Sequence, residues 1–339
     1  MKHIWLKRAL VGAAVIFGAN GAMAEAKWTY ENNVLTGIVA ADGGETAMQL
    51  SLTADGVLSL KSAGTQKVID LSSAAMPEGA PAIRVISNNT FNRNGNITSL
   101  KFPETLEVIG NSVFWECRKL VNVEPFVPAS VTNIDMYTFG CCTALTNGLE
   151  IGFGEGEVKF VANGNVNNAF QSCSLLPYVK FGPGVKELPV IFSDGNIFTG
   201  HEGPIEIWFG PNLAKAAAGA MGTSVGGTNA VSFYFQGDMF SSTSSMFSKT
   251  TAEKSGYRYR FYVGAEGCTK WQEFLANTEY VTPWAKLGDD VKAEYRKHFS
   301  KGRPYGLTTA AAALSDGSGL PEAVWVFSLR STGMCIRIQ

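Results

Sequence analysis

Apolar residues recur through the middle of the chain in one short template, in which the first, fourth and sixth positions are mostly apolar. Six segments follow it, at residues 97–102, 120–125, 176–181, 204–209, 230–235 and 258–263, and residues 145–151 follow it with one inserted residue. Successive copies end at residues 102, 125, 151, 181, 209, 235 and 263, at spacings of 23 to 30 residues. A short strand that returns at such intervals is typical of a leucine-rich-repeat solenoid, whose period is about 20 to 29 residues.

A second pattern lies between these strands: a phenylalanine, a cysteine three residues later and a leucine three residues after that. Its copies are Phe114-x-x-Cys117-x-x-Leu120, Phe139-x-x-Cys142-x-x-Leu145 and Phe170-x-x-Cys173-x-x-Leu176. Because one unit cannot bury its own apolar face, neighbouring units stack and such positions form continuous buried ladders. We therefore predict a structural role for these phenylalanines and cysteines, since no base or second metal ligand recurs beside the thiols.

The run from Val108 to Leu120, VIGNSVFWECRKL, resembles the BspA-type leucine-rich repeat, whose units read roughly I-G-x-x-A-F-x-x-C-x-x-L-x-x-I-x-x-P. The resemblance covers about residues 83–265 and is close in three units. After His201 the units lose the cysteine and the Ala-Phe pair. The resemblance implies an exported bacterial surface protein, in a family that includes adhesins and is not enzymatic as a class.

The flanks of the repeats lack this template. In residues 25–80, apolar residues alternate with polar ones at Met48, Leu50 and Leu52, and Asp55-Gly56 then provides a turn. An Asp-Gly turn between alternating runs predicts a β-hairpin. We expect this segment to be an N-terminal β cap that covers the open end of the first of about seven units in residues 81–265, because an uncovered end unit exposes its core.

Residues 266–339 show a different pattern. Trp271, Phe274 and Leu275 have helical spacing, and a second helical pattern, with Val291, Tyr295 and Phe299, follows the favourable start Asp289-Asp290. Residues 323–329 and 334–338 then predict a closing strand pair. We interpret the segment as a C-terminal helical and strand cap, with an independent functional module as the alternative. The fold expected for the whole chain is thus mainly β with short helices: a leucine-rich-repeat solenoid between an N-terminal β cap and a C-terminal α/β cap.

The first 24 residues have the pattern of a secretory signal peptide. Lys2, Lys7 and Arg8 precede or flank an apolar stretch, and Ala22-Met23-Ala24 forms a cleavage motif. The alternative, a membrane anchor, needs roughly 20 apolar residues, and this stretch is shorter. We expect cleavage before Glu25, no later transmembrane segment, and export to the periplasm, the cell surface or the medium.

Charge and cysteine content refine this prediction. The expected mature chain has 25 basic and 29 acidic residues after loss of the three basic residues of the leader. That balance argues against nucleic acid as a partner, which requires a concentrated positive face. In an exported chain, Cys268 and Cys335 are candidates for a disulfide that closes the C-terminal region, and two buried free thiols are the alternative.

The candidate binding surface comes from the outward positions of the repeat strands, since alternate side chains of a strand face opposite sides. One column is Lys101, Glu124, Glu150, Lys180, Trp208, Tyr234 and Tyr262. The neighbouring column is Ser99, Asn122, Gly148, Tyr178, Glu206, Ser232 and Arg260. We predict that Tyr178, Trp208, Tyr234, Tyr262, Lys180 and Arg260 form a surface for a protein or glycan ligand, because exposed aromatic side chains anchor such partners.

Two alternatives to this surface stay open. In the first, the aromatic column packs under the C-terminal helices. In the second, it is only a stack of side chains that favour β structure, with no ligand. The prediction also depends on the register, because a shift of one residue would turn the whole aromatic set inward.

Catalytic patterns are missing from the sequence. The expected mature chain has two histidines, His201 and His298, and neither lies in a nucleophile, metal or cofactor motif. We therefore predict a protein without cofactor or metal that mediates binding or adhesion at the bacterial cell surface. The rival hypotheses are a structural envelope component that self-associates, and a polysaccharide-active enzyme whose paired carboxylates the sequence does not identify.

Overall fold

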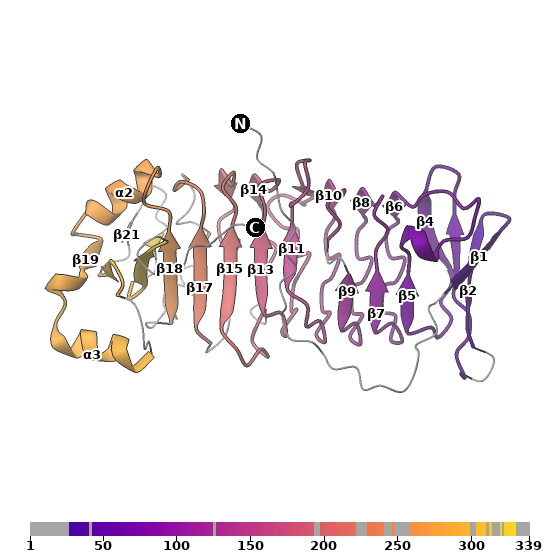
Figure 1. Ribbon diagram of the computed structural model, residues 1–339, viewed down its shortest axis with the longest axis horizontal. Helices are drawn as coiled ribbons and strands as arrows, with labels where there is room; N and C mark the ends of the chain where they lie inside the picture. Colours follow the sequence, from indigo (N-terminus) through magenta and orange to yellow (C-terminus); the bar gives the residue numbers. More distant parts are fainter. Residues whose placement is uncertain are drawn as a thin grey trace.

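The computed structural model describes residues 27–40, 43–124, 127–192, 197–221, 229–240, 246–247, 258–298, 303–309, 312–313, 319–320 and 322–329. The expected signal peptide (1–24), the second closing strand (334–338), Phe299 and Cys335 lie outside these residues. So the expected disulfide and the expected leader keep the status of predictions. The described chain forms an elongated β solenoid with the N-terminal strands at one end and the helices at the other (Figure 1).

The N-terminal segment is an antiparallel meander. Its strands are β1 (Lys27–Glu31), β2 (Val34–Ile38), β3 (Gln49–Leu52) and β4 (Val57–Ser62), paired in that order. The expected hairpin is the β3/β4 turn, where Gly56 has a φ of +80° that only glycine adopts readily. Strand β4 then pairs in parallel with the first repeat strand, so the meander continues directly into the solenoid sheet.

From β4 to β17, the solenoid turns contribute strands alternately to two faces. The first face continues from β4 through β6 (Val85–Ile86), β8 (Val108–Ile109), β10 (Asn133–Ile134) and β12 (Lys159–Phe160), all parallel. In the next two turns, the corresponding strands β14 (Glu187–Leu188) and β16 (Lys215–Ala216) form a separate parallel pair. The first-face sheet is therefore interrupted between β12 and β14.

The second face carries the strands that the repeat template predicts. Strands β5 (Val68–Asp70), β7 (Ser99–Lys101) and β9 (Asn122–Glu124) form one parallel sheet. A larger sheet follows with β11 (Leu149–Ile151), β13 (Tyr178–Phe181), β15 (Ile205–Phe209), β17 (Val231–Phe235) and β18 (Tyr259–Val263), again parallel. The mainly β, repeat-built architecture expected from the sequence is confirmed.

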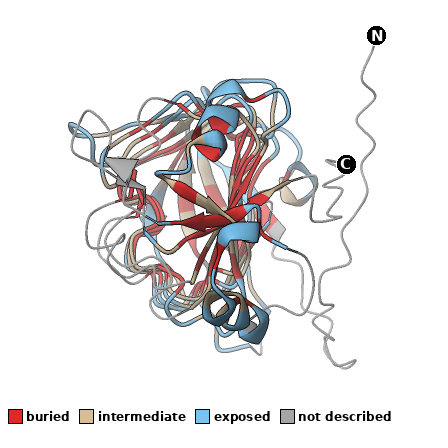
Figure 2. Ribbon diagram, turned by 90° about the vertical axis from the view of Figure 1, so that its left-hand side faces the viewer, coloured by how far each residue is buried: buried red, intermediate tan, exposed pale blue. Residues whose placement is uncertain are grey.

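The space between the faces is filled by ladders of identical side chains. The rings of Phe91, Phe114, Phe139 and Phe170 stack with centroid separations of 5.3, 5.1 and 5.7 Å. Beside them, the thiols of Cys117, Cys142 and Cys173 donate to the carbonyl oxygens of Phe91, Phe114 and Phe139, at 3.0, 3.1 and 3.2 Å. Each cysteine therefore ties its unit to the one before it. Figure 2, a view along the solenoid, shows the buried residues inside the faces and exposed residues outside.

Cys141, which the repeat template leaves unexplained, occupies a turn position rather than an insertion. Its φ of +61° matches those of Arg93, Glu116 and Ser172, the equivalent residues of three other units. Its amide donates to the carbonyl of Gln171 in the next unit, as the amide of Glu116 does to that of Gly140. These equivalent residues therefore share a left-handed backbone conformation and not a type of side chain.

The C-terminal segment extends the second face and also covers part of it. The two expected helices are α2 (Thr269–Ala276), with Trp271, Phe274 and Leu275 buried, and α3 (Asp289–His298). Strand β23 (Trp325–Ser328) pairs in parallel with β18, and β20 (Gly306–Thr308) and β19 (Val281–Pro283) follow it in the sheet, each antiparallel to its neighbour. Two short pieces complete it: η2 (Trp284–Lys286) and the hairpin of β21 (Ala312–Ala313) and β22 (Gly319–Leu320).

Candidate functional site

The outer surface of the second face has the register that the columns require. Lys180 pairs with Trp208, Trp208 with Tyr234, and Tyr234 with Tyr262, while Ser232 pairs with Arg260 in the neighbouring column. The columns read from the sequence are therefore correct in register from β11 to β18.

The aromatic column is a continuous stack of nearly parallel rings. Ring centroids lie 3.8 Å apart between Trp208 and Tyr234 and 4.5 Å apart between Tyr234 and Tyr262, with interplanar angles of 8° and 12°. Phe327 of β23 continues the stack at 4.8 Å from Tyr262. Sequence reasoning missed Phe327, because β23 lies outside the repeat period and only its pairing with β18 places it there.

Most of this stack is covered by the C-terminal segment. Tyr234 and Tyr262 are only 2% and 8% exposed, in a cluster with Leu287, Tyr295, Leu307, Trp325 and Phe327. Burial is the main cause that raises the pKa of the Tyr234 and Tyr262 hydroxyls. The expectation of an exposed stripe is therefore wrong for these two residues, and the alternative, packing under the C-terminal region, describes them. Arg260 is half-buried at the edge of the cluster, and burial lowers the pKa of its guanidinium.

The uncovered end of the stack is an amphipathic surface, which we call the sheet-face patch: Tyr178, Lys180, Glu206 and Trp208, all partly exposed. The indole Nε1 of Trp208 donates to Glu206 Oε2 at 3.1 Å, and the Tyr234 hydroxyl lies 3.3 Å from Glu206 Oε1. Glu206 thereby holds the exposed indole to the buried part of the stack.

Across the patch, Lys180 and Tyr178 are fixed by Glu150. Lys180 Nζ lies 2.9 Å from Glu150 Oε1 and 4.5 Å from the centre of the Tyr178 ring. The Tyr178 hydroxyl is 3.4 Å from the same oxygen, and burial, followed by the charge of Glu150, raises its pKa to about 12. Three of the six predicted ligand-binding residues therefore lie together and accessible in this patch: Tyr178, Lys180 and Trp208.

A hollow of about 390 Å³ opens beside the patch. Its lining includes Tyr178, the exposed ring of Phe153, and the carboxylates of Glu124 and Glu150. The Tyr178 ring lies over Gly148, where a Cβ atom would overlap it. Glycine at this position of the column is therefore what allows the tyrosine to lie flat against the preceding unit.

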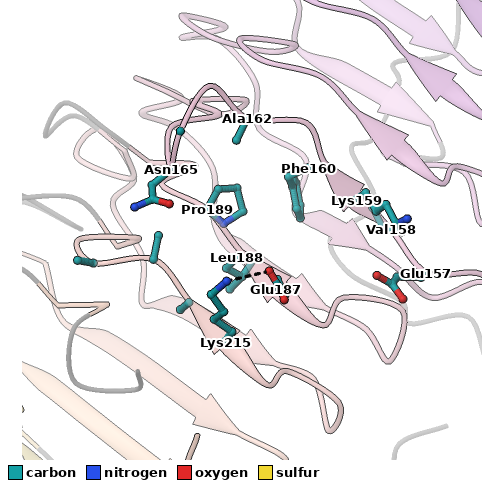
Figure 3. Close-up of a pocket in the computed structure, with 14 residues that line it drawn as sticks. Glu157, Val158, Lys159, Phe160, Ala162, Asn165, Glu187, Leu188, Pro189 and Lys215 are labelled. Carbon is teal, nitrogen blue, oxygen red and sulfur yellow. Dashed lines mark hydrogen bonds and ion pairs between the residues drawn. The ribbon is translucent and has the colours of Figure 1, made fainter. Parts of the chain in front are cut away.

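A second hollow lies on the first face, where the sheet is interrupted (Figure 3). It has a volume of about 650 Å³ between β12 and β14. Four charged side chains line it, those of Glu157, Lys159, Glu187 and Lys215. Glu157 pairs with Lys186 at 2.7 Å, and Glu187 pairs with Lys215 at 3.4 Å. Pro189 is equivalent to Ala217 of the next unit, whose amide donates to the carbonyl of Leu188. Proline has no amide hydrogen, so Pro189 cannot make the corresponding bond to the preceding unit.

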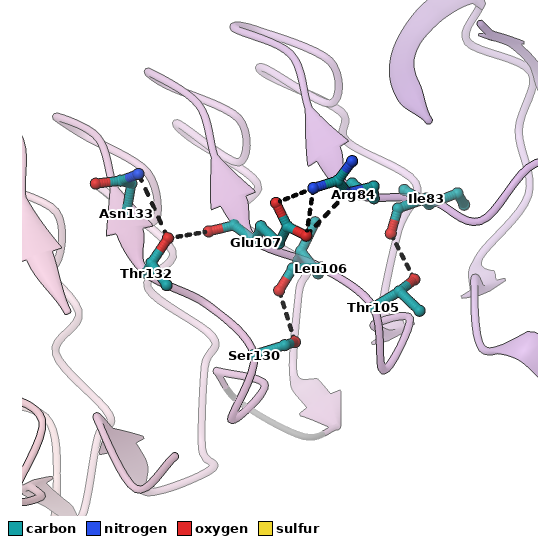
Figure 4. A network of polar contacts seen from close by, with 8 residues as sticks. All are labelled: Ile83, Arg84, Thr105, Leu106, Glu107, Ser130, Thr132 and Asn133. Atoms are coloured by element: carbon teal, nitrogen blue, oxygen red, sulfur yellow. Dashed lines mark hydrogen bonds and ion pairs between the residues drawn. The ribbon is translucent and has the colours of Figure 1, made fainter. Parts of the chain in front are cut away.

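Polar contacts on the first face join successive units. Arg84 Nη2 lies 2.8 Å from Glu107 Oε1, which raises the pKa of the guanidinium and lowers that of the carboxyl (Figure 4). The hydroxyls of Thr105 and Ser130 donate to the carbonyls of Ile83 and Leu106, each in the unit before, at 2.7 and 2.6 Å. Both side chains of the ion pair are well exposed, so it contributes little stability. The arrangement is structural.

In the part of the chain that the structure describes, no three metal-ligating side chains gather at one point. Over the same residues no helix is long and apolar enough to cross a membrane. His201 is half-buried in a turn, where its amide donates to the carbonyl of Phe198.

The chain was compared with known families and structures. Residues 84–197 match the BspA type leucine-rich repeat region in six copies. No curated protein matches the chain.

Several bacterial leucine-rich-repeat structures resemble the chain at low identity. A protein of Bacteroides capillosus is 21% identical, over 36% of this chain and 89% of that one, with a TM-score of 0.27. The pneumococcal vaccine antigen PcpA is 16% identical over 67% of this chain, with a TM-score of 0.39, and the match spans 44% of PcpA. A leucine-rich cell surface protein of Faecalibacterium prausnitzii is 17% identical, over 58% of this chain and 54% of that one, with a TM-score of 0.35.

The family match and the buried ladders agree on the same residues. The matched region contains the stacked phenylalanines from Phe91 to Phe170 and the three thiols that donate to the preceding unit. Residues 84–197 of this chain are thus a BspA-type leucine-rich-repeat region.

Proposed function

We propose that this protein is exported to the bacterial cell surface and binds a protein partner there through the sheet-face patch. Leucine-rich repeats of this type typically occur in non-catalytic binding proteins of the cell surface, which supports the class of function. The observation that carries the site is the accessible end of the aromatic stack, where Trp208 is fixed between Tyr234 and Glu206.

The chemistry of the patch favours a protein surface as ligand. Tryptophan and tyrosine are the residues that most often dominate binding energy at protein interfaces, in particular where they are rigid before binding. Trp208 and Tyr178 are rigid, because each is held by a carboxylate of the same sheet face. Lys180 and Glu206 add charges of both signs, which suits a polar rim with complementary charges on the partner.

Two rival functions each have one observation in their favour. The covered part of the stack, with Tyr234 and Tyr262 in the core, suits a structural envelope component that self-associates. The hollow beside the patch contains two carboxylates, of Glu124 and Glu150, which is the group pair that a polysaccharide hydrolase needs. Glu150 is already bonded to Lys180 and Tyr178, which favours a positioning role for it.

The test is binding of the purified protein to arrays of extracellular-matrix proteins and of glycans. The variant is Trp208→Ala together with Tyr178→Ala; Tyr234 and Tyr262 stay unchanged because their loss would damage the core. Ile38→Ala, which removes an exposed apolar side chain of the meander, is the matched control.

We expect saturable binding to at least one matrix protein, weakened roughly tenfold or more in the double variant and unchanged in the control. Circular dichroism and thermal melting check that the variants fold. Binding that survives the double substitution would refute the sheet-face patch. Self-association without any ligand would favour the structural role, and release of reducing sugar from a polysaccharide, lost in Glu150→Gln, would favour the enzyme.

A further inference from the structure

A second concave surface lies on the turns that connect the two faces. In each unit this turn contains two residues with positive φ, and the first of them are Asn89, Ser112, Tyr137 and Asn168 in four successive units. A hollow of about 600 Å³ runs over these turns. We call it the turn-face hollow, and the residues that matter in its lining are Asn92, Arg93, Trp115, Tyr137, Asn168 and Gln171.

Two aromatic side chains form the middle of the hollow. The rings of Trp115 and Tyr137, both partly exposed, meet edge to face with centroids 5.2 Å apart and planes at 81°. The six-membered part of the indole lies over Gly140, where any Cβ atom would collide with it. The indole Nε1 donates to Glu116 Oε1 at 3.1 Å. The pair is therefore held in place before any ligand arrives.

The backbone at Tyr137 argues that the tyrosine is not there for the turn itself. Its φ is +56°, in the left-handed region that asparagine and glycine tolerate and bulky residues avoid. The same position holds asparagine in two of the other three units, at Asn89 and Asn168. An aromatic ring is thus kept at a position where the fold alone favours a small polar residue.

An unsatisfied polar group borders the aromatic pair. Asn168 is only 7% exposed, and its Oδ1 atom is buried without a hydrogen-bond partner among the residues that the structure describes. Buried acceptors in folded proteins nearly always have a donor, ordered water included. Asn168 lines the hollow, so an amide group, which can both donate and accept hydrogen bonds, lies beside the aromatic pair.

The charges and amides define the class of ligand. Arg93 pairs with Glu116 at 3.5 Å, and Arg118 pairs with the other oxygen of the same carboxylate at 3.5 Å, so two exposed guanidinium groups share one negative charge. Asn92 and Gln171 add amide groups beside the apolar faces of Trp115 and Tyr137, and Asn92 Nδ2 donates to Asn89 Oδ1 at 2.8 Å. Hydroxyl groups and an apolar C–H face on one molecule are the properties of a sugar ring, and the surplus positive charge suits sugars with or without an anionic group. We propose that the turn-face hollow binds a saccharide, at a site separate from the sheet-face patch.

The experiment measures binding of the purified protein to an array of neutral, sialylated and sulfated oligosaccharides, followed by titration calorimetry with the oligosaccharide that binds best. The variants are Trp115→Ala and Asn168→Gly; glycine keeps the positive φ of residue 168 while it removes the amide. Ile38→Ala is the control, and thermal melting of each protein confirms that it is folded.

We expect at least one oligosaccharide to bind, and each variant to raise the dissociation constant about tenfold or more while the control leaves it unchanged. Absence of binding to every oligosaccharide overturns the proposal, as does binding that both folded variants retain. A protein ligand lost in Trp115→Ala overturns the saccharide class. Since the substituted residues differ from those of the sheet-face patch, either proposal can fail while the other holds.

Discussion

At the scale of single residues, three successive units are joined by the way each uses one thiol. A cysteine at the ladder position is small and apolar enough for the core. Its S–H group still donates to the carbonyl of the ladder phenylalanine in the preceding unit. Asn94 occupies the same position in an earlier unit, where its Oδ1 instead accepts from the amides of Asn96 and Ile97. The position thus needs a small hydrogen-bonding side chain.

Burial makes the ladder thiols inert, which predicts their labelling pattern. It raises the pKa of Cys117 and Cys173 to about 12 and that of Cys142 well above its ordinary 9.0, so at pH 8 the reactive thiolate is scarce in the folded chain. With iodoacetamide at pH 8, mass spectrometry is expected to find Cys141, which is half-buried, modified first.

The three ladder cysteines become reactive when urea unfolds the chain, because the thiol pKa then returns to its ordinary value and thiolate forms as the pH rises through 9. The urea sample is the control for labelling chemistry. Labelling of Cys117 or Cys173 as fast as Cys141 in the native protein would contradict a closed core.

At the scale of elements, strand positions follow from the apolar template, but the division into sheets does not. The template segments end within one residue of the ends of β7, β9, β11, β13, β15, β17 and β18. We attribute the interruption of the first face between β12 and β14 to one residue, Pro189, in a segment where the sequence has no strong strand pattern. Its effect appears only when the neighbouring amide and carbonyl are known.

Replacement of this proline tests that explanation. In Pro189→Ala the new amide faces the carbonyl of Phe160, by analogy with Ala217 and Leu188 one unit later. We expect the β12 and β14 edges to join, which narrows the large hollow and protects the amide of residue 189 from hydrogen exchange. Pro183→Ala, in the preceding turn, is the comparison. An amide at 189 that exchanges as fast as a surface loop would show that the proline is not the cause.

At the scale of the whole molecule, the C-terminal segment is part of the solenoid core. Trp325 is fully buried, and Tyr295 of α3 contacts its ring edge to face at 5.2 Å. The same cluster covers Tyr234 and Tyr262, and of the aromatic side chains in the two outward columns it leaves Trp208 and Tyr178 partly exposed. Packing of this segment therefore sets the extent of the candidate site.

Truncation of Trp325 to alanine is expected to lower the free energy of unfolding by roughly 3–5 kcal/mol, as large buried side chains do when they leave a cavity. Urea denaturation followed by far-UV circular dichroism measures it. Trp115→Ala, at a partly exposed tryptophan, is expected to cost much less. Equal, small losses in the two variants would mean that the C-terminal segment is not integral to the fold.

The repeat, its period, the ladder positions and the register of the outward columns could be predicted from the sequence, because they are local patterns repeated at a fixed interval. The two C-terminal helices could be predicted from their own local spacing of apolar residues. The tertiary structure decided which of the outward residues are accessible. Tyr234 and Tyr262 have the same sequence pattern as Trp208, and they differ because β23 and α3, which lie outside the repeat, pack over them. It also brought Trp115, Tyr137 and Asn168 together from separate units. Such contacts depend on long-range packing, which no period along the chain encodes.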